Sequence, residues 1–175
     1  MSGDAMSSEL EIRPAQAADV AGVLPLVSKI AALHQSWDRA KYGYDADPAE
    51  RYRRWLTTRA DDPRSVFLVA AREGRIIAFL IAAVESEIPI YTLREYGFFH
   101  DLWVEEQYRH EGIARQIVML AIERFRQIGV SQIRLDTAAV NEPARSLFES
   151  CGFRVSSVEM LLELPGQPNT DGGSA

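Results

Sequence analysis

The sequence predicts a single α/β domain in which a mixed, mostly antiparallel sheet carries helices on both faces. Two observations indicate this class. Two apolar runs, at 66–71 and 75–84, are separated only by Arg-Glu-Gly, which is typical of an antiparallel hairpin. Further along, an apolar strand at 96–104 precedes a helical pattern at 112–128 and an alternating strand at 131–137. A strand–helix–strand crossover of this kind requires a parallel pair.

The first third of the chain predicts one strand and two helices. Residues 10–13 favour a short strand that ends at a proline. Asp19 is placed to cap a helix over 20–34, where apolar residues recur at helical spacing. Residues 37–48 are aromatic and rich in Gly and Asp, so we expect a loop or a broken helix. A second helix is predicted over 48–59.

The last third predicts one further helix and the end of the sheet. A polar loop is expected at 85–95, and Gly129 is placed to close the helix that begins at 112. Asn141 can cap a helix that stops at Gly152. Residues 153–164 then predict one or two final strands. The expected order is therefore β-α-α-β-β-β-α-β-α-β.

Length and composition agree with one domain over residues 10–164. The chain has 175 residues, of which 47% are hydrophobic and 25% charged, as in an ordinary globular protein. Residues 1–9 are small and polar, and we expect them to be flexible. Residues 165–175 are rich in Pro, Gly and Ser and predict a disordered tail.

Charge and cysteine content exclude several classes of function. A net charge of -6 argues against nucleic-acid binding, which needs a basic face. The single Cys151 cannot form an internal disulfide, and His34, His100 and His110 form no metal-binding pattern, so no metal is expected. We see no apolar stretch long enough to cross a bilayer and no basic leader. We therefore expect no membrane partner and a cytoplasmic location.

Residues 102–114 carry the most informative pattern. Leu-Trp-Val at 102–104 ends a strand, and a short turn leads into a helix whose first residues include Gly112 and Ala114. A helix N-terminus offers free N–H groups, here those of residues 110–114, and the positive end of the helix dipole. Small residues let a ligand approach the main chain. The pattern predicts a phosphate site. No Lys-Ser/Thr follows Gly112, so it is not a P-loop.

A second motif supports the first. Residues 141–153 read Asn-x-x-Ala-x-x-Leu-Phe-Glu-x-x-Gly-Phe, and they follow Ala114 by 27 positions. Together with Arg109-His-Glu-Gly-Ile-Ala114 and the opening Ile12-Arg-Pro-Ala15, this resembles the GNAT superfamily of acyl-CoA-dependent N-acetyltransferases. The family's loop reads Arg/Gln-x-x-Gly-x-Gly/Ala, and its second helix reads Asn-x-x-Ala-x-x-Leu-Tyr. The resemblance covers about residues 10–164.

The resemblance implies a GNAT-like fold, with a central splayed parallel pair of strands, and acetyl-CoA as cosubstrate. It places the pyrophosphate on the loop and the pantetheine arm along free backbone groups of the strand before it, as a pseudo-strand. We expect the Glu111 side chain to point to solvent, away from the phosphates. The implied cofactor-binding residues are Leu102, Trp103, Val104, Arg109, His110, Glu111, Gly112, Ile113, Ala114, Asn141, Ala144 and Phe148.

The implied reaction needs a base for the amine and a donor for the developing oxyanion. The family uses a strand N–H as donor, here that of Val104. For the base we consider His100 and Asp101, which as neighbours on a strand are expected on opposite faces. Imidazole suits a base at neutral pH, whereas Asp101 is a candidate to capture the substrate ammonium or to orient a loop. The alternative for both residues is a packing role in the sheet.

One residue departs from the family pattern. Phe148 stands where the family usually has the Tyr that protonates the departing thiolate. The thiolate can leave unprotonated, since a thiol pKa near 8.5 makes it a fair leaving group. Another group can serve, and Tyr108, Ser146, Ser150 and Cys151 are near in sequence. The third alternative is a non-catalytic acyl-CoA-binding or sensor domain.

The resemblance implies that the acceptor is an amine of a small molecule or of a protein. The family builds its acceptor pocket from segments that correspond to 33–44 and 85–95. Aromatic and acidic side chains in them suit an ammonium group: Trp37, Asp38, Tyr42, Tyr44, Glu85, Glu87, Tyr91 and Glu95. The sequence does not separate a polyamine, an aminoglycoside, an amino acid and a protein N-terminus. A homodimer is left open by the resemblance, since dimers are common in the family.

Overall fold

The computed structural model describes residues 9–44 and 47–164. The predictions for residues 1–8 and 165–175 therefore lie outside the described residues. Short 3-10 turns occupy Ala17–Asp19 and Glu106–Tyr108. The main elements, in chain order, are β1 (Glu11–Pro14), α1 (Val20–Trp37), α2 (Pro48–Ala60), β2 (Ser65–Arg72), β3 (Arg75–Ser86), β4 (Glu95–Val104), α3 (Ile113–Ile128), β5 (Ile133–Leu135) and α4 (Glu142–Ser150).

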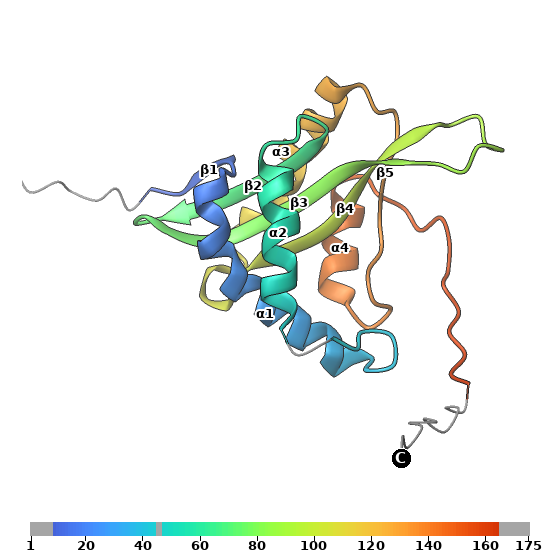
Figure 1. Cartoon of the computed structure of the whole chain (residues 1–175), viewed down its shortest axis with the longest axis horizontal. Helices are drawn as coiled ribbons and strands as arrows, with labels where there is room; N and C mark the ends of the chain where they lie inside the picture. Colours follow the sequence, from blue (N-terminus) through green and yellow to red (C-terminus); the bar gives the residue numbers. More distant parts are fainter. Residues whose placement is uncertain (1–8, 45–46, 165–175) are drawn as a thin grey trace, which may run out of the picture.

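The strands form one sheet in the order β1-β2-β3-β4-β5. The first three pairs are antiparallel, and only β4 and β5 run parallel. Figure 1 shows α1 and α2 in front of the sheet and α3 behind it. The predicted mixed sheet with helices on both faces is confirmed.

A separate apolar core lies on each face of the sheet. Phe79 and Trp103 belong to the core beneath α1 and α2, whereas Phe99 and Phe125 belong to the core beneath α3. Phe125 is fully buried, and burial of a side chain of this size contributes about 1.5–3 kcal/mol. Its ring needs Gly97 on β4, because a Cβ there would lie 2.9 Å from the ring. The two cores fix β4 between α2 and α3.

Helix α1 differs from its prediction in three ways. It runs on to Trp37. The Asp19 side chain makes no cap contact with α1; its two oxygens accept from Arg13 at 2.6 and 2.8 Å, and one also accepts from the N–H of Gln16. By length and composition alone, Ala17–Trp37 is also apolar enough to cross a membrane, contrary to our expectation. Its buried residues, such as Val23, pack against the sheet, and a core helix meets the same criterion.

The parallel pair of strands is short, and this opens the sheet. Strand β5 has three residues, fewer than the predicted 131–137, and its register pairs Gly97–Phe99 of β4 with Ile133–Leu135. Strand β4 continues for five residues beyond Phe99. Residues 100–104 therefore have β3 on one side and no described strand on the other. The predicted splay lies at this point.

The final strands predicted at 153–164 are wrong, because no strand is formed there among the described residues. A strand exists only when its backbone groups pair with a neighbour, and these residues pair with none. Figure 1 shows the chain after α4 running away from the sheet on its own. We call residues 154–164 the C-terminal segment.

Candidate active site

A β-bulge at His100 shapes the centre of the site. In the β3–β4 register Asp101 faces Ile81 and Phe99 faces Ala82, so His100 is an extra residue on β4. A bulge changes the alternation of side chains along a strand. As a result His100 and Asp101 both contact α2, through Trp55 and Tyr52. The expectation that these neighbours lie on opposite faces is wrong for this reason.

The His100 imidazole lies among aromatic rings. Its ring centroid is 5.1 Å from those of Trp55 and Phe98, both edge-on. Nε2 lies 3.2 Å from a carboxylate oxygen of Glu85 on β3, but outside hydrogen-bonding geometry. Burial lowers the pKa of His100, and the charge of Glu85 only partly opposes this. The imidazole is therefore neutral at pH 7, as a general base requires.

Asp101 is a partly buried carboxylate that accepts a hydrogen bond from a phenol. The Tyr52 hydroxyl donates a hydrogen bond to its Oδ2. Burial raises the pKa of Asp101, and the hydrogen bond from Tyr52 and the nearby His34 and His100 oppose the rise. A buried carboxyl with a raised pKa is a common feature of functional sites. The structure thus adds Tyr52, which sequence reasoning placed only on a helix.

The main chain of β4 offers free groups at alternate residues. The Glu105 N–H donates to the carbonyl of Ile77 on β3 at 2.9 Å, and main-chain groups alternate between the two sides of a strand. The backbone groups of Trp103 therefore point toward β3, where Trp103 pairs with Phe79. The backbone groups of Leu102 and Val104 point to the side where β5 has ended, and of these the Val104 carbonyl accepts from Arg109. The expectation of free groups on all three residues fails at Trp103, whose backbone is already paired.

Several backbone N–H groups in the turn after β4 are unpaired. Among the described residues, the N–H groups of 110–115 donate to no acceptor. His110 and Gly112 have positive φ angles of 67° and 79°, so the turn is tight, and Gly112 is the N-cap of α3. For His110 this left-handed conformation costs about 1–2 kcal/mol. Unpaired N–H groups at a helix end are the groups that bind anions, so the geometry agrees with the phosphate site that the sequence predicts here.

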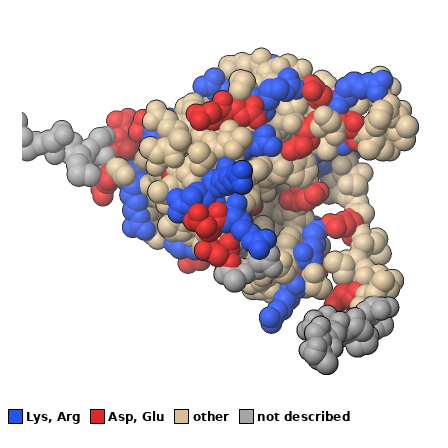
Figure 2. All heavy atoms as spheres, viewed as in Figure 1, with Lys and Arg blue, Asp and Glu red and all other residues tan. Residues whose placement is uncertain are grey.

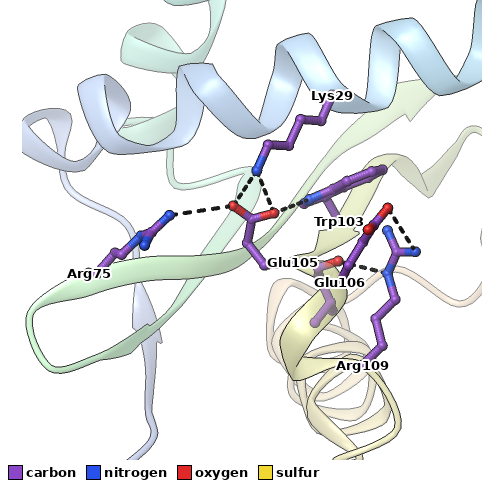
Figure 3. Close-up of polar contacts among 7 residues, drawn as sticks. Lys29, Arg75, Trp103, Glu105, Glu106 and Arg109 are labelled. Atoms are coloured by element: carbon purple, nitrogen blue, oxygen red, sulfur yellow. Dashed lines mark hydrogen bonds and ion pairs between the residues drawn. The ribbon is translucent and has the colours of Figure 1, made fainter.

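Arg109 is folded back onto β4. Its Nε donates to the Val104 carbonyl at 3.0 Å, and its guanidinium carbon lies 4.8 Å from the Trp103 ring centroid. A weaker contact of 3.9 Å joins it to Glu106. Figure 3 shows the guanidinium beside the Trp103 ring. Arg109 therefore fastens the turn to the strand edge.

Glu111 is exposed to solvent, as expected, and there it also pairs with an arginine. Its carboxylate oxygen lies 2.7 Å from Nη2 of Arg72, at the end of β2. The Arg72 guanidinium also lies 5.0 Å from the ring of Tyr108 in the same turn. The positive charge of Arg72 offsets the carboxylate that stands beside the free N–H groups.

Glu105 is a residue that sequence reasoning missed. It is 4% exposed, and its carboxylate accepts from Nζ of Lys29 at 2.6 and 2.7 Å and from the indole of Trp103 at 3.4 Å (Figure 3). Burial would raise the pKa of Glu105, but these hydrogen bonds and the charges of Lys29 and Arg75 lower it. Lys29 within the otherwise apolar run of α1 was the available signal. The cluster ties the turn to α1.

Helix α4 lies next to the end of the β4–β5 pair. Asn141 caps it, accepting from the N–H of Ala144 at 3.3 Å as predicted. Phe148 is buried, with ring centroids 6.3 Å from Phe99 and 5.5 Å from Phe153. These contacts make Phe148 part of the core that borders the splay.

The alternative proton donors are placed differently. Ser150 Oγ and Cys151 Sγ lie 2.9 and 3.8 Å from Nη1 of Arg115 on α3. Tyr108 packs against Arg72 in the turn. Ser146 is exposed on α4. These contacts hold Tyr108, Ser150 and Cys151 against arginines, away from the imidazole and carboxylate of β4.

The predicted acceptor residues divide into two groups. His34 lies 4.9 Å from the Tyr42 ring and 5.4 Å from the Trp37 ring, and its Nδ1 is 3.4 Å from the Tyr44 hydroxyl. Burial raises the pKa of Tyr44, and the Asp101 charge adds to this rise, so Asp101 lies near this aromatic cluster.

Most of the acidic candidates already have partners. Glu87 pairs with Arg134 at 2.5 Å and Glu95 with Arg64 at 2.6 Å. Asp38 accepts from the N–H groups of a local turn. Tyr91 is half-exposed in the β3–β4 connection. The aromatic cluster near Asp101, and Glu85 beside His100, are therefore the parts of the predicted acceptor segments that lie at the candidate site.

Comparisons with known proteins agree with this geometry. The chain is 30% identical over 141 residues to N-acetyltransferase family 8 member 3 of Rattus norvegicus, which covers 75% of this chain and 59% of that protein. Against human N-acetyltransferase 8 the match is 30% over 90 residues, 51% of this chain and 39% of the human protein. The chain thus spans less than two thirds of these relatives.

Solved structures share the fold. A mutant of the BH1408 protein of Bacillus halodurans has a TM-score of 0.76 at 24% identity, covering 89% of this chain and 99% of its own. A predicted acetyltransferase of Clostridium acetobutylicum, solved with acetyl-CoA, has a TM-score of 0.70 at 18% identity, covering 89% and 96%. The model of the Acetyltransferase (GNAT) family matches residues 30–153. On the sequence match and the splayed sheet together, the chain belongs to the GNAT acetyltransferase family.

Proposed function

We propose that this protein transfers an acetyl group from acetyl-CoA to a primary amine, by direct attack within a ternary complex. The observation that carries the proposal is the continuity of two features: six unpaired N–H groups at 110–115 directly follow the open edge at Leu102 and Val104. A diphosphate fits the first feature, and an amide-containing arm fits the second. Coenzyme A has both groups in this order.

The direction of β4 indicates which part of the cosubstrate Leu102 and Val104, at the open edge, would each contact. The diphosphate end of the cosubstrate binds the turn that follows Val104, so its arm passes Val104 before it reaches Leu102. We therefore assign pantetheine pairing to the N–H of Val104, whose carbonyl is taken by Arg109, and place the thioester carbonyl beside the N–H of Leu102. The Leu102 N–H would then donate to the developing oxyanion. From the sequence we expected the Val104 N–H to be that donor. Val104 lies two residues further along the strand, which is one repeat of its alternation.

The amine is expected on the α2 side of β4. Asp101 there attracts the ammonium of the acceptor, and the aromatic cluster of His34, Tyr42 and Tyr44 borders it. We assign His100 as the base, because burial keeps its imidazole neutral. Glu85, 3.2 Å away, stabilises the imidazolium that forms when the proton arrives.

The thiolate is expected to leave without a proton from α4. Phe148 has no donor, and Ser150 and Cys151 are held against Arg115 on α3. Coenzyme A thiolate is a fair leaving group because a thiol pKa is about 8.5. A non-catalytic acyl-CoA-binding domain remains the second candidate, and the burial of Phe148 is the observation that favours it.

Release of free thiol from acetyl-CoA, measured across a panel of amines, tests the proposal. The panel contains polyamines, aminoglycosides, amino acids and peptides with free N-termini. We expect thiol release that depends on one class of amine and stops in Gly112→Glu. Calorimetric binding of acetyl-CoA without thiol release for any amine would favour the binding domain. Equal binding of ATP and coenzyme A would contradict the pantetheine assignment.

A further inference from the structure

Glu105 is a buried carboxylate that the proposed reaction does not use. It follows β4 directly and precedes the N–H groups of 110–115, yet its side-chain contacts are with Lys29, Trp103 and Arg75 and not with that turn. A buried ion pair often stabilises a fold no better than apolar residues of the same size, because both charges lose their hydration. The position in which this pair holds its neighbours is therefore the informative feature.

The charged side chains on the surface of the same face are different. Figure 2 shows acidic and basic side chains next to one another over α1 and α2. In an exposed pair on α2, that of Glu50 with Arg53, both side chains are about half exposed. Water and salt screen such pairs, so each of them fixes little. Glu105 is instead buried, and two contacts of its carboxylate with Lys29 hold it in one position.

The indole of Trp103 joins Glu105 to Arg109. Its N–H donates to the Glu105 carboxylate, and the Arg109 guanidinium lies over its ring. Figure 3 shows the indole between the carboxylate and the guanidinium. Trp103 is 6% exposed, so the ring has little room to turn. Because contacts in a chain polarise one another, an anionic acceptor at the indole N–H also strengthens the attraction between the ring and the cation.

Arg109 presents its charge at the proposed diphosphate site. Its Nε is taken by the Val104 carbonyl, whereas Nη1 has only a contact of 3.9 Å with the exposed Glu106. The guanidinium comes one residue before the unpaired N–H groups of 110–115. An arginine binds a phosphate best when its planar fork is already oriented toward the anion. The orientation of this fork is what the Trp103 ring fixes.

We propose that Glu105 is a positioning residue for coenzyme A: it fixes the Trp103 ring, and the ring fixes the Arg109 guanidinium at the diphosphate site. The inference rests on the proposed function, because it takes coenzyme A as the ligand of the turn. Lys29 anchors the chain of contacts to α1. Glu105 itself does not touch the ligand. Its loss should therefore weaken the binding of coenzyme A and leave the acceptor side in place.

Calorimetric titration with coenzyme A tests this role through a double-mutant cycle. Glu105→Gln should weaken binding about fivefold, because a neutral amide holds the indole and Lys29 less firmly. Arg109→Gln should weaken it about tenfold. The double variant should bind as Arg109→Gln does, since Glu105 acts through Arg109. If the two losses add, or if Glu105→Gln binds within about twofold of the wild type, the proposal is overturned.

Asp19→Asn is the matched control for a loss of stability. It breaks another ion pair beside α1, that of Asp19 with Arg13 at 2.6 Å, which has no contact with the turn. It should lower the urea midpoint but leave the dissociation constant for coenzyme A unchanged. If Glu105→Gln does not fold, Glu105→Met fills the same space without burying a charge, and it should show the same loss of affinity.

Steady-state kinetics separate positioning from a merely structural role. In Glu105→Gln the KM for acetyl-CoA should rise several-fold, while kcat and the KM for the amine stay within about twofold of the wild type. A fall in kcat with an unchanged KM for acetyl-CoA would refute the positioning role. A wild type that binds no coenzyme A would refute both this role and the proposed function, whereas equal binding by the wild type and Glu105→Gln refutes the role alone.

Discussion

Tyr52 of α2 donates its phenol hydrogen to the carboxylate of Asp101 on β4, beside the bulge at His100. The contact crosses from helix to sheet and is partly buried. Burial raises the pKa of Asp101, and the Tyr52 hydrogen bond counteracts part of that rise. Tyr52 thus helps to keep Asp101 ionised, which an ammonium-binding carboxylate requires.

Tyr52→Phe should therefore raise the pKa of Asp101 further. Asp101 would then stay protonated up to a higher pH, so the KM for the amine should increase several-fold at about pH 6 and recover as the pH rises. The measurement is the pH profile of kcat/KM for the amine. Tyr96→Phe, at a tyrosine that packs on Phe98 and Arg134, is the control and should leave the profile in place. A uniform loss at all pH values would indicate packing alone.

Features that rest on contacts within a few residues could be predicted from the sequence, whereas features that depend on distant partners could not. The helix entry at Gly112 and the cap at Asn141 were predictable, because each rests on contacts within a few residues. The bulge at His100 was not, since it arises from the register against β3. For the pair of Lys29 and Glu105, which are 76 positions apart, the sequence offers a lysine within an apolar helix as a signal but nothing that identifies its partner.

The failed prediction of final strands at 153–164 has a similar origin. The residues have the alternation of a strand, but a strand also needs a neighbour, and the neighbour is not specified by the local sequence. The same applies to Asp19, whose carboxylate is taken by Arg13 instead of capping α1. At 153–164 the partner strand is lacking, and at Asp19 an arginine six residues away competes with the capping role.

Gly112 and Gly129 provide a matched pair for the phosphate site. Both cap α3 in the left-handed conformation, with φ of 79° and 95°. An alanine at either position costs about 1–2 kcal/mol of stability. Gly112→Ala should also weaken coenzyme A binding about tenfold or more, because the new methyl, 3.9 Å from Nε2 of Gln116, would take up room at the helix end where we propose that the diphosphate binds. Gly129→Ala should leave the dissociation constant unchanged. Calorimetric titration compares them, and equal affinities would contradict the loop assignment.

The pair formed by Arg72 and Glu111 should tune coenzyme A affinity through charge. Arg72→Gln leaves the Glu111 carboxylate uncompensated near the diphosphate, so affinity should fall about five- to tenfold at low salt. The double variant Arg72→Gln/Glu111→Gln should recover most of the loss. Screening predicts a smaller effect in about 0.5 M salt. If the double variant binds as weakly as the single one, Arg72 itself contacts the ligand and the compensation is refuted.

Glu105→Gln should make stability less dependent on pH. Because the pKa of Glu105 is lowered in the folded state, its stabilising contribution is present above the unfolded value of about 4.3 and is lost as the pH falls through the folded value. The variant should lose about 1.5–3 kcal/mol at pH 7 and much less near pH 3.5. Urea unfolding at both pH values measures this. Glu106→Gln, at the neighbouring and exposed carboxylate, should show little change at either pH.

Phe148→Tyr tests whether the missing phenol limits turnover. The ring is buried against Phe99 and Phe153, so an added hydroxyl without a partner should cost about 1–3 kcal/mol of stability. If the thiolate leaves unaided, kcat should stay within about twofold of the wild type, and its pH dependence should be unchanged. Steady-state thiol release between about pH 6 and 9 gives both quantities. A rise in kcat of about tenfold, largest below the thiol pKa, would instead show that proton donation limits the native enzyme.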